Sequence, residues 1–164
     1  MVYGGGDTEE SNGYCAAFKA KYSALEDTQR GWTEHVLSHK KLVTCTGLVF
    51  YWPDTSMARS GYISNTTSIY NYPIQSLATA EVIPIAVTYM WHKMKALKLK
   101  GFIVNTIHDS IITEEPKEET QVIDSIAKEA MSVDVVTYLE KVYKVHFDVP
   151  LDMDCKAGKF WGEK

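Results

Sequence analysis

The sequence predicts an α+β chain, and two patterns support this prediction. Apolar and aromatic side chains recur at spacings of three and four residues in several segments, which is typical of helices. Short runs rich in β-branched and aromatic residues lie between turn residues elsewhere, which is typical of strands. With 164 residues, of which 45% are apolar and 23% charged, the chain has the composition of a folded soluble protein, and one domain is the default expectation.

The first part of the chain is expected to hold two helices and a hairpin. Helical spacing runs over residues 8–39, with a break expected within residues 23–28. Residues 42–52 are rich in Thr, Val, Phe and Tyr, and the Thr-Gly pair at 46–47 supplies the turn of a β-hairpin. Residues 54–68, which are rich in Ser, Thr, Gly and Asn, are expected to form an ordered loop.

The rest of the chain is expected to combine helices with short strands. A long helix is predicted over residues 73–97, with a bend at Pro84. Further helices are predicted over residues 118–130 and 135–142, and residues 147–153 are expected to form a last short strand. Four glutamates are expected to face solvent: Glu114, Glu115, Glu118 and Glu119.

Charge and cysteine content narrow the possible classes of function. Seventeen Lys and Arg against 21 Asp and Glu leave a net charge of −4, so no diffuse positive field marks a nucleic-acid-binding protein. Cys15, Cys45 and Cys155 form neither a disulfide framework nor a zinc-binding pattern, which predicts free thiols in a reducing compartment. We expect no secretory signal and no membrane segment, because the most apolar run, residues 82–91, is shorter than the roughly 20 residues of a spanning helix.

The most informative residues are His108 and Asp109, which lie between two β-branched apolar runs at 102–107 and 111–113. If these runs form a hairpin, both residues lie at its tip, where a carboxylate can face a cation or a polar ligand. An unpaired charge buried among isoleucines costs several kcal/mol, which favours such an exposed place. An ordinary turn is the alternative, since Asp is common in turns.

Three segments together resemble the family A DNA polymerases. Residues 104–110, Val-Asn-Thr-Ile-His-Asp-Ser, resemble motif C, a hairpin of the palm whose tip reads His-Asp. Residues 71–75, Asn-Tyr-Pro-Ile-Gln, resemble the Asn-x-Pro-x-Gln block at the start of a long palm helix. Tyr3 and Gly4 resemble the end of motif B in the fingers. Order and approximate spacing agree over essentially the whole chain, and the resemblance is strongest to phage-type members.

This resemblance implies a specific fold and domain organisation. Residues 1–42 would be the trailing helices of the fingers. Residues 43–164 would be the palm subdomain, an antiparallel sheet with packed helices. The palm would be incomplete, because no segment resembles motif A, the strand that carries the other metal-binding Asp. The implied location is the cytoplasm of a bacterial or phage-infected cell.

The resemblance also implies roles for individual residues. Asp109 would bind Mg²⁺ in a two-metal site, and His108 would contact the primer terminus. Asn71 and Gln75, four residues apart, would contact acceptors in the minor groove of the primer-template near the terminus. The alternatives are a structural histidine for His108, a helix N-cap for Asn71 and a solvated side chain for Gln75.

Two more residues are candidate DNA contacts. Tyr3 would stack beside the templating base, or else belong to a disordered tail. Arg59 is a candidate for contact with the DNA backbone, although a scattered basic residue is more often simply solvated. The sequence departs from the family pattern at Ser110, where Glu is common, and at Thr67, where many relatives have Arg.

The implied activity is template-directed DNA synthesis from deoxynucleoside triphosphates. Because motif A and the Lys of motif B are not found, we expect the isolated chain to be inactive without an N-terminal polymerase fragment that supplies them. The competing hypothesis is a non-catalytic palm remnant that binds DNA or a polymerase partner.

Overall fold

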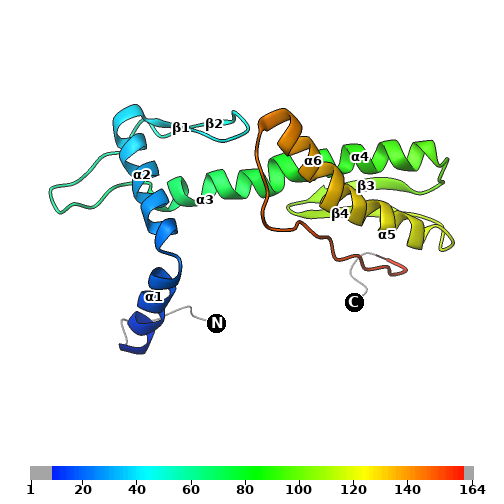
Figure 1. The fold of residues 1–164 in the computed structure, drawn as a ribbon, viewed down its shortest axis with the longest axis horizontal. Coiled ribbons are helices and arrows are strands. Elements are labelled where there is room, and N and C mark those ends of the chain that lie inside the picture. Colours follow the sequence, from blue (N-terminus) through cyan, green and yellow to red (C-terminus); the bar gives the residue numbers. More distant parts are fainter. Residues whose placement is uncertain (1–8, 161–164) are drawn as a thin grey trace. The chain divides into compact units, whose positions relative to one another are not determined.

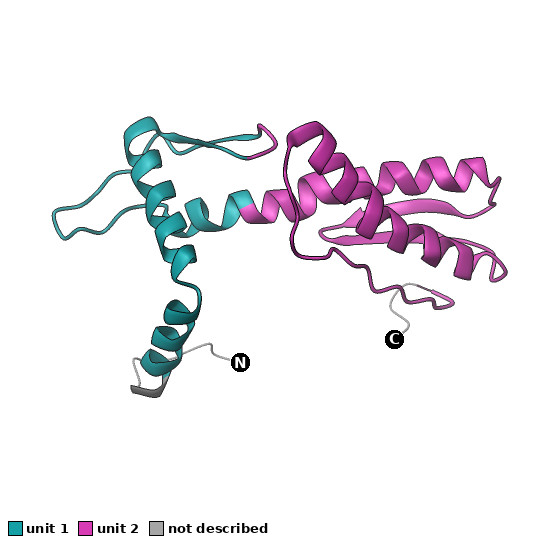
Figure 2. Ribbon diagram, in the orientation of Figure 1, with its two compact units in different colours: residues 1–44, 48–73 teal, residues 45–47, 74–164 magenta. Residues whose placement is uncertain are grey.

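The structure, a computed structural model, describes residues 9–160. The chain is α+β, with helices and two small antiparallel sheets (Figure 1). It divides into two compact units (Figure 2). The first comprises residues 1–44 and 48–73, and the second comprises residues 45–47 and 74–164. The boundary between fingers and palm at residue 42 stays a prediction.

The first unit begins with the two predicted helices, α1 (Glu9–Lys21) and α2 (Ser23–His39). The break falls at Tyr22, one residue before the range expected for it. Lys40 ends α2 in the left-handed conformation, with φ of 60°, and its backbone N–H donates to the carbonyl of Val36. Such a left-handed residue satisfies carbonyls at the helix end that have no partner within the helix.

The predicted hairpin follows, with β1 (Lys41–Val43) antiparallel to β2 (Val49–Tyr51). Gly47, in its turn, has φ of 92°, which glycine adopts without a steric penalty. The hairpin helps to build the core of the first unit, a cluster of four buried apolar side chains from α2, β1, the end of the hairpin and the next helix: Val36, Leu42, Trp52 and Ile69.

The long helix predicted over residues 73–97 begins earlier than expected. It consists of α3 (Thr66–Ser76), the π-helical segment η1 (Leu77–Val82) and α4 (Ile83–Ala96). The seven extra residues continue through Pro73, which is buried inside α3. Pro84, expected to bend the helix, lies in the first turn of α4 directly after η1, where a wider π-helical turn accommodates its missing N–H.

The second unit contains the predicted hairpin of β3 (Phe102–Ile107) and β4 (Ser110–Glu114). After it come α5 (Thr120–Glu129), η2 (Ala130–Val135), α6 (Val136–Tyr138) and η3 (Leu139–Tyr143). Two buried apolar clusters join these helices to the preceding helical segments. The first contains Val82, Ile83, Ala86, Met131, Val135 and Leu139. The second contains Met90, Met94, Ile123, Ile126, Ala127 and Ala130.

The strand predicted at residues 147–153 was wrong, because this segment has no ladder of backbone hydrogen bonds in the structure. Phe147, Leu151 and Met153 still pack against the buried clusters, with polar neighbours facing solvent between some of them. The alternation of apolar and polar residues therefore indicates an extended segment with one apolar side. A strand also needs a pairing partner along its backbone, and Pro150 removes one donor.

Two of the four glutamates predicted to face solvent are partly buried, so that prediction was wrong for Glu115 and Glu119. The Glu119 carboxylate accepts backbone N–H groups of Lys100, at 2.9 Å, and of Gly101, at 2.8 Å. These two hydrogen bonds to the Glu119 carboxylate hold the turn before β3 against the start of α5. Glu114 and Glu118 are exposed, as predicted.

None of the helices described is both long and apolar enough to cross a membrane.

Candidate active site

The hairpin of β3 and β4 presents His108 and Asp109 as a two-residue loop. The register pairs Ile107 with Ser110, so only these two residues lie beyond the ladder. His108 has φ of 55°, whereas Asp109 is not among the residues with positive φ. A positive φ in the first loop position alone is the pattern of a type II′ turn, where glycine is usual. A non-glycine residue with positive φ is uncommon and costs roughly 1–3 kcal/mol, and His is among the side chains that adopt it more often.

His108, Asp109 and Ser110, the three residues at the tip, are exposed. Ser110 donates its hydroxyl to the carboxylate of Asp109 at 3.5 Å, a long hydrogen bond. The carboxylate therefore avoids the cost of burial and keeps acceptor positions open to solvent. The prediction that His108 and Asp109 lie at a hairpin tip is confirmed, and the short loop limits how far the carboxylate can move.

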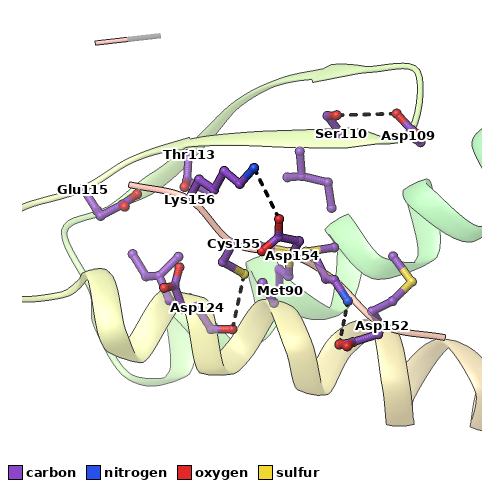
Figure 3. A pocket seen from close by; sticks show the side chains of 15 residues that line it. Met90, Asp109, Ser110, Thr113, Glu115, Asp124, Asp152, Asp154, Cys155 and Lys156 are labelled. Atoms are coloured by element: carbon purple, nitrogen blue, oxygen red, sulfur yellow. Dashed lines mark hydrogen bonds and ion pairs between the residues drawn. The ribbon is translucent and has the colours of Figure 1, made fainter. Parts of the chain in front are cut away.

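Asp109 and Ser110 also line a cavity of about 230 Å³ in the second unit. Most of the other lining residues come from β4, α5 and the extended segment at residues 152–156 (Figure 3), and Met90 of α4 and Met131 of η2 complete the lining. The carboxylates around it come from five residues: Asp109, Glu115, Asp124, Asp152 and Asp154. Within residues 9–160, no three His, Cys, Asp or Glu side chains come together as a metal-binding group. The cavity is therefore acidic, but its carboxylates are dispersed.

Several polar groups that line the cavity already form ion pairs or hydrogen bonds within the chain. Lys156 lies 3.5 Å from Asp154 as an ion pair, and the Cys155 thiol points to the carbonyl of Asp124 at 3.9 Å (Figure 3). Burial raises the pKa of Cys155, and the negative charge of Asp124 adds to the effect. One Glu115 carboxylate oxygen is buried, with no hydrogen bond from the part of the chain described.

This wall was not identified from the sequence. Its signal was the alternation at residues 151–155, where Leu151, Met153 and Cys155 are partly buried and the two aspartates between them are exposed. Such a pattern places the aspartates on one side of an extended chain. It does not show which other element that side faces, so the cavity could not be inferred.

Asn71 and Gln75 both lie on α3 and both are exposed. Residues four apart on a helix share a face, which agrees with the predicted spacing. Asn71 lies inside the helix, so the alternative that it caps the helix start was wrong. Asn71 belongs to the first unit, whereas Gln75 and the hairpin tip belong to the second.

The remaining candidates lie elsewhere. Tyr3 falls outside the described residues. Arg59 is exposed in the loop of the first unit, within a turn that the N–H of Gly61 closes by donating to the carbonyl of Ala58. The structure thus brings His108, Asp109 and Ser110 together at one tip and places Arg59 and Asn71 in the other unit.

Comparisons with known proteins identify the family. The model of the family described as DNA polymerase family A matches residues 5–163. The chain belongs to DNA polymerase family A. DNA polymerase I of Bacillus subtilis is 31% identical over 119 residues, which are 65% of this chain and 12% of the relative. DNA polymerase I of Borreliella burgdorferi is 24% identical over 167 residues, 94% of this chain and 16% of the relative.

A solved structure supports the fold. The POL domain of Pol1 from M. smegmatis, in a complex with DNA primer-template and dNTP, matches with a TM-score of 0.68. The match covers 88% of this chain and 24% of that domain, at 21% identity. The predicted family and the α+β polymerase fold are therefore confirmed, whereas a phage-type origin stays a prediction. The chain spans less than a fifth of the curated relatives it matches.

Proposed function

We propose that this region of a family A polymerase supplies the hairpin carboxylate for template-directed DNA synthesis from deoxynucleoside triphosphates. One observation carries the proposal. Asp109 is exposed at the tip of a two-residue hairpin loop, in a chain of this family. The primer-template and dNTP in the complex of the M. smegmatis domain support the same class of ligands for this chain.

The tip suits a magnesium ion. Mg²⁺ takes oxygen ligands and is usually held by one or two carboxylates together with waters and substrate phosphates. Asp109 offers an accessible carboxylate, with the Ser110 hydroxyl as a neighbouring oxygen. In two-metal sites such ions stabilise the attacking and leaving oxygens of phosphoryl transfer. Asp109 is therefore the residue of this chain that would hold the ion.

The other candidates would position nucleic acid. His108, beside Asp109, would contact a phosphate or sugar at the primer terminus through its exposed ring. The amides of Asn71 and Gln75 would bind acceptors that every base pair presents in the minor groove, which permits contact without sequence choice. Arg59 would contact a backbone phosphate, and Tyr3 would stack beside the templating base.

Catalysis would need a further polymerase segment. A two-metal site requires more carboxylate ligands than the single Asp109 of the tip provides. We expect the complementary Asp and a nucleotide-binding Lys to come from an N-terminal polymerase segment, either on the same polypeptide or on a partner fragment. The 164 residues alone should then give no measurable primer extension.

The test is primer extension by this chain mixed with an N-terminal fragment of a family A polymerase that carries motifs A and B. Asp109→Asn should abolish extension, because it removes a charged metal ligand, and should leave the circular dichroism spectrum unchanged. Asp148→Asn is the matched control, an exposed aspartate in the same unit. Extension by the Asp109→Asn mixture at the rate of the control would contradict the proposal.

A non-catalytic role is the second outcome that this experiment recognises. If the unmodified mixture binds primer-template but never extends it, the palm-remnant hypothesis replaces the catalytic one. Extension by the purified 164-residue chain without a partner would contradict the need for a further segment.

A further inference from the structure

Two histidines lie one turn apart on the exposed face of α2. The rings of His35 and His39 are stacked, with centroids 4.2 Å apart and an interplanar angle of 18°. Both side chains are exposed. Residues four apart on a helix are neighbours on one face, and this is the spacing at which two histidines can bind one metal ion. Because the stacked ring planes are nearly parallel, the His35 ring must turn about its Cβ–Cγ bond before both rings face one ion, and its exposed position allows this turn. The pair lies in the first unit, so it is distinct from the hairpin tip.

A hydrogen bond orients one of the two rings. Nδ1 of His39 lies 3.1 Å from the carbonyl oxygen of His35. A carbonyl only accepts, so Nδ1 carries the hydrogen and donates it. In the neutral ring Nε2 then carries the lone pair that a metal ion binds. A bond from the other ring nitrogen to a backbone carbonyl is the arrangement that orients metal-binding histidines.

The surroundings leave the rings accessible. Gly31, one turn before His35, has no side chain, and no other atom lies within 4 Å of the position a Cβ would take. Ser38 is small, and its hydroxyl donates to the carbonyl of Glu34 at 3.1 Å. The ammonium of Lys40 donates to the carbonyl of Thr55 at 2.5 Å, so its charge is held by another contact. His39 is also the last residue of α2, where the helix dipole favours a cation.

We propose that His35 and His39 form a chelating site for a divalent transition-metal ion such as Ni²⁺, Cu²⁺ or Zn²⁺. Imidazole nitrogen suits these ions, whereas Mg²⁺ prefers oxygen ligands. The two imidazoles replace two waters of the hydrated ion, and no electron is transferred. The bound ion joins the last two turns of α2, beside the buried Val36 of the first-unit core. This site is independent of the proposed polymerase activity.

The test is calorimetric titration of the untagged full chain with Ni²⁺. Cys15 and Cys45 are exposed thiols that bind the same ions, so every protein in the series carries Cys15→Ser and Cys45→Ser. One equivalent of Ni²⁺ should bind. His35→Ala or His39→Ala should each weaken binding about tenfold or more, because a chelate loses one arm. His92→Ala, which removes an exposed histidine on α4, is the matched control and should leave the affinity unchanged.

A second measurement reports where the ion acts. Saturating Ni²⁺ should slow amide hydrogen exchange at residues 36–40 in the His92→Ala control, because an ion bound by both histidines stabilises the folded end of α2. It should not slow exchange there in His35→Ala, which lacks one of the two ligands. Saturating Mg²⁺ should give no such slowing. Equal Ni²⁺ affinity in His35→Ala and His92→Ala would overturn the proposal. It would also be overturned if the His92→Ala control bound Ni²⁺ no more tightly than a double variant, His35→Ala with His39→Ala.

Discussion

The two compact units differ in how much apolar surface they bury. The first has one cluster of four buried apolar side chains, whereas twelve such side chains form the two clusters of the second. Helix α1 of the first unit also leaves aromatic rings in solvent, with Tyr14 70% and Phe18 55% exposed. Since burial of apolar surface is the main stabilising term, the second unit should be the more rigid scaffold, and it carries the hairpin tip.

The largest expected effect is the loss of a core side chain. Leu139 in the second unit and Ile69 in the first are both fully buried. Leu139→Ala and Ile69→Ala should each cost about 3 kcal/mol of unfolding free energy, from lost burial and the cavity left behind. Hydrogen exchange resolved along the chain should show faster exchange mainly around the cluster that contains the mutated residue. Equal acceleration across both units in either variant would contradict the division into two cores.

The next largest effect on stability is expected from replacing one glycine in each unit by alanine. A Cβ at Gly101 would lie 2.6 Å from Cδ1 of Ile123 and 2.7 Å from Cβ of Glu115. Gly101→Ala should therefore destabilise the second unit by about 2 kcal/mol. At Gly31, on α2, a Cβ meets no other atom within 4 Å. Gly31→Ala should stabilise the first unit by about 0.5–1 kcal/mol, because alanine favours helix. Urea denaturation measures both, and the same sign in the two variants would refute the packing argument.

A smaller effect compares one ion pair in each unit. In the second, Nζ of Lys93 lies 2.5 Å from Oδ2 of Asp134 and 3.0 Å from Oε1 of Glu129. Burial alone lowers the pKa of Lys93, but the hydrogen bonds and charges of both carboxylates outweigh it and raise the pKa. Lys93→Met should cost about 1 kcal/mol near neutral pH. Lys19→Met, which breaks the exposed pair with Glu26, should cost almost nothing.

The contribution of the Lys93 ion pairs to the free energy of unfolding should decrease at high pH. Because the folded state raises the pKa of Lys93, it binds the proton more tightly than the unfolded chain. This contribution is complete below the usual Lys value of 10.5 and is lost as the pH rises through the higher folded value. The difference in urea midpoint between wild type and Lys93→Met should therefore stay constant up to about pH 10 and narrow as the pH rises above 10.5. A difference that widens would show that the sign is wrong.

The smallest effect concerns thiol chemistry and leaves stability unchanged. Burial raises the pKa of Cys155, whereas Cys15 and Cys45 are exposed. Because the thiolate is the reactive form, Cys155 should react with a disulfide reagent at pH 8 more slowly than either exposed thiol. Mass spectrometry of the modified peptides gives the three rates. If Cys155 reacted first, its environment in the second unit would have to be open to solvent.

Local patterns in the sequence were sufficient for much of the fold. Turn chemistry at residues 46–47 and the β-branched runs around His108 and Asp109 predicted both hairpins. A short loop, of five residues in the first hairpin and two in the second, sets the register of its own strands. The spacing of aromatic residues predicted α1 and α2 to within a residue of their break. Asp109 was found for the same reason, since its exposure follows from its position in the loop.

The start of α3 depended on contacts between distant segments. The side-chain amide of Asn65 donates to the hydroxyl of Thr55 at 3.0 Å, and the Trp52 indole donates to Ser68 at 2.9 Å. These bonds hold the first turn of the helix against residues that precede it by more than nine positions. A local reading therefore began the helix at Pro73, where proline is common, and missed the turns before it.

The sequence by itself determined the family, the α+β class, the two hairpins and the exposed Asp109, because each depends on motifs or on short-range periodicity and turn preference. Only the tertiary structure decided that residues 147–153 form no strand, that Glu119 binds the backbone at Gly101, and that an acidic cavity lies beside the hairpin. These features require knowing which segments meet in space. Burial and pairing are properties of both partners, so no single segment could reveal them.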